Sequence, residues 1–147
     1  MNRYRKILFV CTGNTCRSPM AETILKNLMP EQEVISRGLV VLFPEPVNPK
    51  AETVLANHNL KIANHVTRGL RPADMEEGTL VLTMTEEQKG RIIKNYGIKE
   101  NVYTLKEYVG ELGDVTDPYG GTLMDYEDCC VELVRLIKKL VYKLAEE

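Results

Sequence analysis

The feature that most constrains the fold is a short, wholly apolar run near the start of the chain. Residues 7–10 read Ile-Leu-Phe-Val, with no polar residue among them. Continuous runs of this kind, in contrast to alternating ones, are typical of strands that are buried on both faces of a parallel sheet. Further strands are predicted at residues 33–35, 79–84 and 102–105. The sequence therefore predicts a mostly parallel sheet that is covered on both faces.

Helical patterns lie between these strands. After Ser18-Pro19, apolar side chains recur at the spacing of one helix face, at Ala21, Ile24, Leu25 and Leu28. We expect Ser18 to be the N-cap of this helix and Pro19 to occupy its first position. The pair Asn48-Pro49 repeats the same start signal before a second helix.

Two further helices also carry boundary signals. Thr85 and Gln88 are spaced as a capping box, and the helix that they open should end near Gly97. One apolar stripe marks a long last helix and consists of Tyr126, Cys130, Leu133, Ile137, Leu140 and Leu144. This alternation of strand and helix predicts a single three-layer, doubly wound α/β domain over residues 1–147. Residues 38–48 and 107–125 are the least regular segments.

The composition argues against several classes of function. The chain has 147 residues, enough for one hydrophobic core, and its 19 basic and 21 acidic residues give a net charge of −2. That balance is not typical of a protein that binds nucleic acid or a membrane surface. The apolar run at residues 7–10 is too short for a signal peptide or a membrane span. We therefore expect a cytoplasmic protein, and a monomer.

The cysteines and histidines do not form a metal-binding pattern. The chain has four cysteines and two histidines, which are Cys11, Cys16, Cys129, Cys130, His58 and His65. A structural disulfide framework is not expected in the reducing cytoplasm. No Cys/His cluster has the spacing of a zinc site. We expect neither a metal nor another cofactor.

The loop between Cys11 and Arg17 predicts a binding site for phosphate. Ligands of open α/β sheets bind beyond the carboxyl ends of the strands, and Cys11 ends the first strand. The loop leads to a helix N-terminus, whose N–H groups and dipole favour an anion. Arg17 adds a planar guanidinium that can grip two phosphate oxygens. The residues that would surround the anion are Thr12, Gly13, Asn14, Thr15, Cys16 and Ser18. The same field favours a thiolate at Cys11, which suits nucleophilic attack on phosphorus.

A second segment, 113-GDVTDPYGG-121, supplies a candidate general acid. A leaving group needs a proton in the transition state, and Asp117 is the carboxyl group that we favour for this transfer. Pro118 stiffens the turn that follows it. Asp114 lies in the same segment, and spacing alone leaves it open as the competing carboxylate.

These motifs resemble the low-molecular-weight protein phosphatase family. The segments that carry the resemblance are residues 10–22, 36–38, 64–65 and 117–120, and the likeness covers the whole chain. It implies a four-stranded parallel sheet flanked by helices, with a phosphate-binding loop between the first strand and the first helix. It also implies that Cys11 carries a phosphocysteine intermediate, that Arg17 binds the phosphoryl group and that Asp117 protonates the leaving group.

The resemblance implies roles for other residues as well. Asn14 would hold the loop in its strained shape, with Ser36 and His65 as supports, and Ser18 would hydrogen-bond the thiolate. Cys16 would be a redox partner that forms a reversible disulfide with Cys11. The remaining cysteines, Cys129 and Cys130, lie in the last helix and are interpreted as packing residues.

Thr15 bears on the choice of substrate. Members of the family that act on tyrosine usually carry a bulky aliphatic residue just before the second cysteine, whereas Thr15 resembles the bacterial protein arginine phosphatases of the family. We therefore expect phosphorylated protein substrates and favour phosphoarginine, with phosphotyrosine as the alternative. Residues 39–44 would wall one side of the pocket. Val40, where arginine-directed members carry an aromatic residue, and Tyr119 would contact the substrate, and Tyr119 could stack on a phenyl ring or a guanidinium.

Two other classes of function are disfavoured. Thioredoxin-coupled arsenate reductases have a similar first loop, but they need two further cysteines in the middle of the chain. Residues 17–128 contain none, so this class would require Cys129 or Cys130 to reach the site. A phosphate-binding module without catalytic activity would be expected to lack the nucleophile or the acid, and both Cys11 and Asp117 are present. A phosphatase of small molecules stays open as an alternative, because the anion site recognises only the phosphoryl group.

Overall fold

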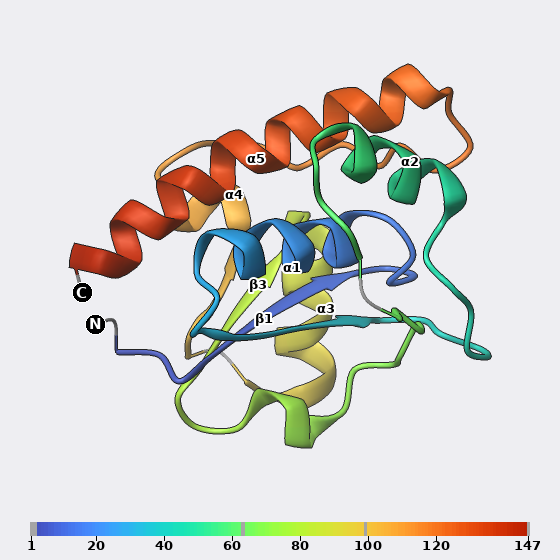
Figure 1. The fold of residues 1–147 in the computed structure, drawn as a ribbon. Helices are drawn as coiled ribbons and strands as arrows, with labels where there is room; N and C mark the ends of the chain where they lie inside the picture. The colour runs from blue at the N-terminus through green and yellow to red at the C-terminus, as the bar shows by residue number, and fades with distance from the viewer. Residues whose placement is uncertain (1–2, 63, 99, 147) are drawn as a thin grey trace.

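A four-stranded parallel sheet forms the centre of the molecule (Figure 1). The computed structural model describes residues 3–62, 64–98 and 100–146. The strands are β1 (Lys6–Cys11), β2 (Glu33–Gly38), β3 (Thr79–Thr83) and β4 (Val102–Thr104). Their order in the sheet is β2-β1-β3-β4, and every neighbouring pair is parallel. The predicted strands and their parallel arrangement are confirmed.

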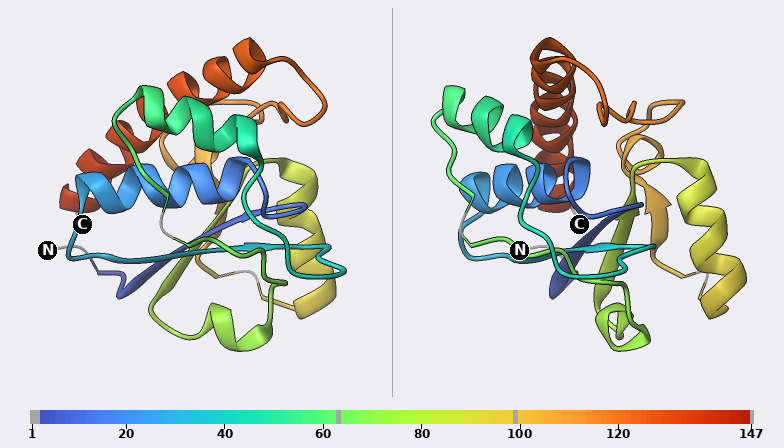
Figure 2. Two further views of the ribbon diagram at one scale, coloured as in Figure 1. Left: turned by 45° about the vertical axis from the view of Figure 1, so that its right-hand side comes forward. Right: turned by 90° about the vertical axis from the view of Figure 1, so that its right-hand side faces the viewer.

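Helices cover both faces of the sheet and complete three layers (Figure 2). They are α1 (Arg17–Leu28), α2 (Pro49–Asn57), α3 (Glu86–Tyr96), α4 (Leu105–Tyr108), α5 (Leu123–Glu146) and the short 3₁₀ helix η1 (Pro72–Met75). Helices α1 and α5 pack against each other over one face, with α2 beside α5. Helix α3 covers the opposite face at β3 and β4. None of the described helices is both long enough and apolar enough to cross a membrane.

Strand β1 is buried along its whole length because it lies inside the sheet and between two helical layers. Successive side chains of a strand point to opposite faces. Ile7, Phe9 and Cys11 therefore pack into the core under α1 and α5. Leu8 and Val10 pack into the second core, which lies under α3. This alternation sends the Cys11 side chain toward the α1 side of the sheet.

Most of the predicted helix boundaries are confirmed. The Thr85 hydroxyl accepts from the Gln88 N–H, and α3 is followed by Gly97 in the left-handed conformation with φ 67°. The Asn48 side chain accepts from the Lys50 N–H, with Pro49 at the start of α2. These signals are reliable because each acts within one turn of the helix that it bounds.

The prediction that Ser18 caps the first helix is wrong. Helix α1 begins earlier, at Arg17, so Pro19 is its third residue and the prediction that Pro19 occupies the first position is also wrong. The N-cap residue is Cys16, which makes no side-chain capping bond among the described residues. The Ser18 hydroxyl lies instead 2.9 Å from the Cys11 sulfur. The loop between them is tight enough to bring the first turn of the helix against the end of β1. The Ser18 hydroxyl therefore contacts Cys11, outside the helix, and does not cap the helix N-terminus.

Candidate active site

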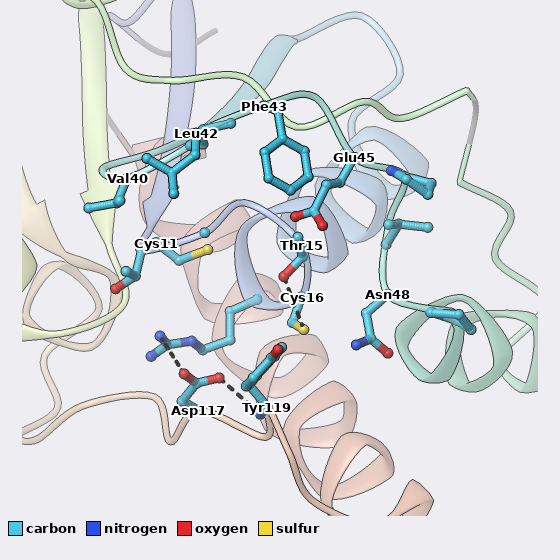
Figure 3. A pocket seen from close by; sticks show the side chains of 17 residues that line it. Cys11, Thr15, Cys16, Val40, Leu42, Phe43, Glu45, Asn48, Asp117 and Tyr119 are labelled. Atoms are coloured by element: carbon cyan, nitrogen blue, oxygen red, sulfur yellow. Dashed lines mark hydrogen bonds and ion pairs between the residues drawn. The ribbon is translucent and has the colours of Figure 1, made fainter.

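A cavity of about 580 Å³ opens at the carboxyl end of β1 (Figure 3). Residues from three segments line it, together with residues 47–49 at the start of α2. We name these segments the phosphate loop (residues 11–18), the outer wall (residues 39–46) and the acid loop (residues 113–121). The predicted site residues that line the cavity are Cys11, Thr12, Gly13, Thr15, Cys16, Arg17, Val40, Asp117 and Tyr119. The other predicted residues, Asn14, Ser18, Ser36 and His65, are connected to one another behind the phosphate loop.

Asn14 is the centre of the phosphate loop. It is fully buried and has a positive φ of 60°. Its amide Nδ2 donates to the hydroxyls of Ser18 and Ser36, at 2.9 and 3.0 Å, and its Oδ1 accepts from the Arg68 N–H at 3.0 Å. The Asn14 carbonyl oxygen lies 2.8 Å from Nε2 of His65. Since every polar group of this side chain has a partner, the left-handed backbone of the loop is held from three directions.

This network leaves the Ser18 hydroxyl able to donate a hydrogen bond to Cys11. Because the backbone N–H of Arg68 can only donate, the Asn14 side-chain atom that it contacts must be the amide oxygen. The atom that contacts Ser18 is therefore the amide nitrogen, which donates to the Ser18 hydroxyl. The Ser18 hydroxyl accepts that bond, and its own proton is then free to point at the Cys11 sulfur, 2.9 Å away. A hydroxyl that donates to sulfur stabilises the thiolate over the neutral thiol.

Ser36 extends this chain of hydrogen bonds from Asn14 toward the outer side of α1. It accepts from Asn14 and donates to Oε1 of Glu22 at 2.6 Å. The other carboxylate oxygen of Glu22 accepts from Lys26 at 2.5 Å. A charged pair on the outer side of α1 therefore anchors a chain of hydrogen bonds that ends behind the phosphate loop.

Arg17 is buried at the base of the cavity, beside the acid loop. Its Nη1 donates to the carbonyl of Val115 at 2.9 Å, and its Nη2 lies 3.5 Å from Oδ2 of Asp117. The Asp117 side chain is 52% exposed, and its Oδ1 accepts from the Tyr119 N–H at 3.0 Å. A carboxyl group held at the mouth of the cavity in this way can exchange a proton with a bound molecule.

The structure separates the two carboxylates that spacing left open. Asp117 lines the cavity, as Figure 3 shows. Asp114 accepts a hydrogen bond from the Glu86 N–H at 2.9 Å and does not line the cavity. It lies at the N-terminus of α3, where a carboxylate is favoured by the helix dipole.

The cysteines lie in two different environments. Cys11 and Cys16 both line the cavity, and the Cys16 sulfur lies 3.6 Å from the hydroxyl of Tyr126. Burial raises the pKa of Cys16 above that of an ordinary thiol. Cys129 and Cys130 are buried in the core on α5, which confirms their interpretation as packing residues. Burial raises the pKa of Cys129 to about 12 and that of Cys130 to about 11, so both are neutral thiols at pH 7.

The outer wall is attached to the phosphate loop through its backbone. The N–H groups of Leu39 and Val40 donate to the carbonyls of Cys11 and Thr12, at 3.0 and 2.9 Å. Its side chains project over the cavity, and Leu42 is 87% and Phe43 62% exposed.

Glu45 and Asn48 also line the cavity, and the sequence reasoning missed both as site residues. Glu45 stands between two prolines in an irregular segment, a pattern that carries no functional signal. Asn48 has the sequence pattern of a helix cap, and it does cap α2 in the structure. Within the described ranges, no group of three or more His, Cys, Asp or Glu side chains is placed to hold a metal ion.

Comparison with known proteins agrees with this geometry. The family described as low molecular weight phosphotyrosine protein phosphatase matches residues 6–147. A relative from Staphylococcus haemolyticus, named low molecular weight protein-tyrosine-phosphatase PtpB, is 41% identical over 135 residues, which are 92% of this chain and 96% of that protein.

Two solved structures share both fold and sequence with this chain. A low molecular weight protein tyrosine phosphatase from T. tengcongensis superposes with a TM-score of 0.89 at 39% identity, over 95% of this chain and 99% of that one. The arginine phosphatase YwlE, solved as a cysteine-to-serine mutant with a phosphorylated active-site serine, superposes with a TM-score of 0.91 at 38% identity, over 97% of each chain. Similar proteins thus carry both tyrosine and arginine phosphatase names.

Proposed function

This chain belongs to the low molecular weight phosphotyrosine protein phosphatase family, and from that premise we propose that it hydrolyses phosphorylated protein side chains through a phosphocysteine on Cys11. The observation that carries the proposal is the 2.9 Å contact between the Ser18 hydroxyl and the Cys11 sulfur, in a cavity that also holds the buried Arg17. In this proposal, Ser18 donates to the Cys11 thiolate and the guanidinium of Arg17 binds the phosphoryl group.

In the first step, the Cys11 thiolate attacks phosphorus and the bond from phosphorus to the leaving group breaks. Arg17 and the N–H groups at the start of α1 stabilise the charge on the three equatorial oxygens. Asp117 gives its proton to the leaving nitrogen or oxygen. The products of this step are the dephosphorylated side chain and phosphocysteine.

In the second step, the ionised Asp117 takes a proton from water and the resulting nucleophile attacks phosphorus. The sulfur–phosphorus bond breaks, its electron pair returns to sulfur, and inorganic phosphate leaves. Ser18 donates to the returning thiolate and makes it a better leaving group. The phosphorylated active-site serine of the solved arginine phosphatase supports a covalent intermediate at this position.

For the substrate, we propose phosphoarginine. Thr15 lines the cavity, and its hydroxyl offers a polar contact where a longer aliphatic side chain would offer only bulk. Asp117 could pair with the guanidinium of the leaving group as well as protonate it. The solved arginine phosphatase at 38% identity supports this choice. The tyrosine phosphatase names of other relatives support phosphotyrosine as the alternative.

The test is turnover of two peptides that differ only in carrying phosphoarginine or phosphotyrosine. We expect a higher kcat/KM for phosphoarginine and a preference that shifts toward phosphotyrosine in Thr15→Ile. The variant Thr15→Val keeps the side-chain volume and removes the hydroxyl, so it separates the effect of the hydroxyl from the effect of side-chain size. A wild-type preference for phosphotyrosine would establish the alternative substrate.

We further infer that the protein works as a monomer in the cytoplasm. All four cysteines are free thiols, and a cysteine nucleophile has to stay reduced in order to act. Size-exclusion chromatography with light scattering would measure the oligomeric state.

A further inference from the structure

The cavity carries more negative than positive charge. Its charged lining residues are Arg17, Glu45 and Asp117, one cation and two carboxylates. Asp117 lies beside Arg17, at 3.5 Å. Glu45 stands on the outer wall, across the cavity from the acid loop (Figure 3). A second carboxylate beside a phosphate-binding loop weakens the binding of a phosphoryl dianion unless the substrate also brings a positive charge.

The backbone of Glu45 is held firmly in place. Its N–H donates to the hydroxyl of Thr67 at 2.9 Å, and its carbonyl accepts from the Thr67 N–H at 2.8 Å. Thr67 itself is buried. Pro44 and Pro46 flank the residue and restrict the backbone on both sides. The carboxylate is therefore displayed from a fixed point, and Figure 3 shows it pointing toward Thr15.

The Glu45 carboxylate makes no hydrogen bond or ion pair with any other residue that the structure describes. In contrast, the carboxylates of Glu76, Glu107 and Glu111 each pair with a lysine or an arginine. Glu45 is thus an unpaired acid that lies in the wall of a phosphoryl-binding cavity, where it is free to meet a cation brought by a ligand.

We propose that Glu45 is a specificity-determining residue that pairs with the guanidinium of phosphoarginine. This inference rests on the proposed function. A phosphorylated arginine presents a cationic, planar guanidinium directly beside the phosphorus, whereas the ring of phosphotyrosine is neutral. With the phosphoryl group on Arg17, the guanidinium would extend into the cavity that Glu45 lines, and planar guanidinium groups bind carboxylates well. Glu45 then lowers the affinity for neutral leaving groups and raises it for this cationic one.

The experiment compares Glu45→Gln with wild type on the matched phosphoarginine and phosphotyrosine peptides. Glutamine keeps the shape and removes the charge. We expect kcat/KM to fall about fivefold on phosphoarginine, the upper range for an exposed charge pair, and to stay level or rise on phosphotyrosine. Glu45→Lys should lower the ratio of kcat/KM on phosphoarginine to kcat/KM on phosphotyrosine further. Glu52→Gln is the matched control, because Glu52 is an exposed carboxylate in the first turn of α2 that does not line the cavity.

A third peptide, with phosphotyrosine flanked by arginine, distinguishes the source of the cation. If Glu45→Gln lowers turnover of this peptide as much as turnover of the phosphoarginine peptide, Glu45 pairs with a residue beside the phosphorylated one. That result overturns the proposal. Phosphoarginine turnover that Glu45→Gln leaves unchanged, in a variant with wild-type Tm, overturns the role of Glu45 alone. A wild-type chain that does not hydrolyse phosphoarginine overturns the proposed substrate and this inference together.

Discussion

The phosphate loop and the outer wall face each other across one cavity but are built in opposite ways. Cys11, Asn14, Arg17 and Ser18 of the phosphate loop are buried, and their polar groups are paired. On the outer wall, apolar side chains are exposed, and the segment is held mainly through its backbone. The groups proposed to perform the chemistry are thus fixed, while those that would contact the rest of the substrate can change at little structural cost.

The two regions meet at Gly38. A Cβ atom there would lie 2.7 Å from the Val41 side chain and 3.0 Å from both the Asn14 Cβ and the Thr12 carbonyl oxygen. Only glycine lets the outer wall approach the phosphate loop this closely. The following predictions test the contrast between the fixed loop and the variable wall.

The largest effect should come from Cys11→Ser. Loss of the nucleophile should lower turnover of every phosphopeptide by at least about 10⁴-fold, because the remaining groups only bind and orient the substrate. Steady-state kinetics measures this loss. Cys16→Ser is the control within the same loop and should stay within about tenfold of wild type. Turnover by Cys11→Ser close to the wild-type rate would rule out the phosphocysteine mechanism.

Asn14→Ala should damage both stability and activity. It leaves the hydroxyls of Ser18 and Ser36 and the N–H of Arg68 without their partner, in a buried site. We expect a loss of about 3 kcal/mol in the free energy of unfolding and a fall in kcat of about 100-fold. Urea denaturation and kinetics measure the two effects.

Asn59→Ala is the matched control for Asn14→Ala. Asn59 is exposed and has the same positive φ of 60°. Alanine should therefore cost only the backbone term there, about 1 kcal/mol. Equal losses at the two positions would mean that the hydrogen bonds of Asn14 contribute nothing.

Ser18→Ala should slow the second chemical step. Without the hydroxyl, the Cys11 thiolate loses a donor at 2.9 Å, and we expect the rate of phosphocysteine hydrolysis to fall about tenfold. A larger pre-steady-state burst of product would reveal the slower step. Thr23→Ala removes a hydroxyl from the same helix that donates to the Pro19 carbonyl and does not line the cavity, and it should leave the burst unchanged. A burst that is equally small in both variants would exclude this role for Ser18.

Substitutions on the outer wall should have the smallest effects. In Leu42→Ser or Phe43→Ser we expect a free energy of unfolding within about 0.5 kcal/mol of wild type, because both side chains are exposed. KM for peptide substrates should rise about threefold with kcat unchanged, since apolar contact area is lost at the cavity. Leu112→Ser is the control, at a side chain that is 96% exposed and outside the cavity lining. A large fall in kcat in Leu42→Ser would mean that the outer wall takes part in the chemical step, against the contrast drawn between it and the phosphate loop.

Local signals in the sequence were sufficient for most of the fold. The apolar run at residues 7–10 is a central strand, and Asn48, Thr85 and Gly97 mark helix ends where they were expected. The interval from Cys11 to Arg17 likewise predicted that both would lie at one anion site, and both line the cavity. Each of these depends on neighbours within a few residues, so the amino-acid order alone specifies it.

Other assignments depended on segments that are distant in the chain. Whether Asp114 or Asp117 reaches the cavity depends on how the acid loop crosses between α3 and Arg17. Ser18 has the sequence pattern of a helix cap, and only the packing of the loop against β1 places its hydroxyl at Cys11. Glu45 enters the cavity because Thr67, from another part of the chain, holds its backbone. The sequence by itself thus determined the elements and the phosphate loop, through local propensity and spacing. Tertiary structure decided which acids line the cavity and which hydroxyl lies at Cys11, because those positions depend on contacts between residues far apart in the chain.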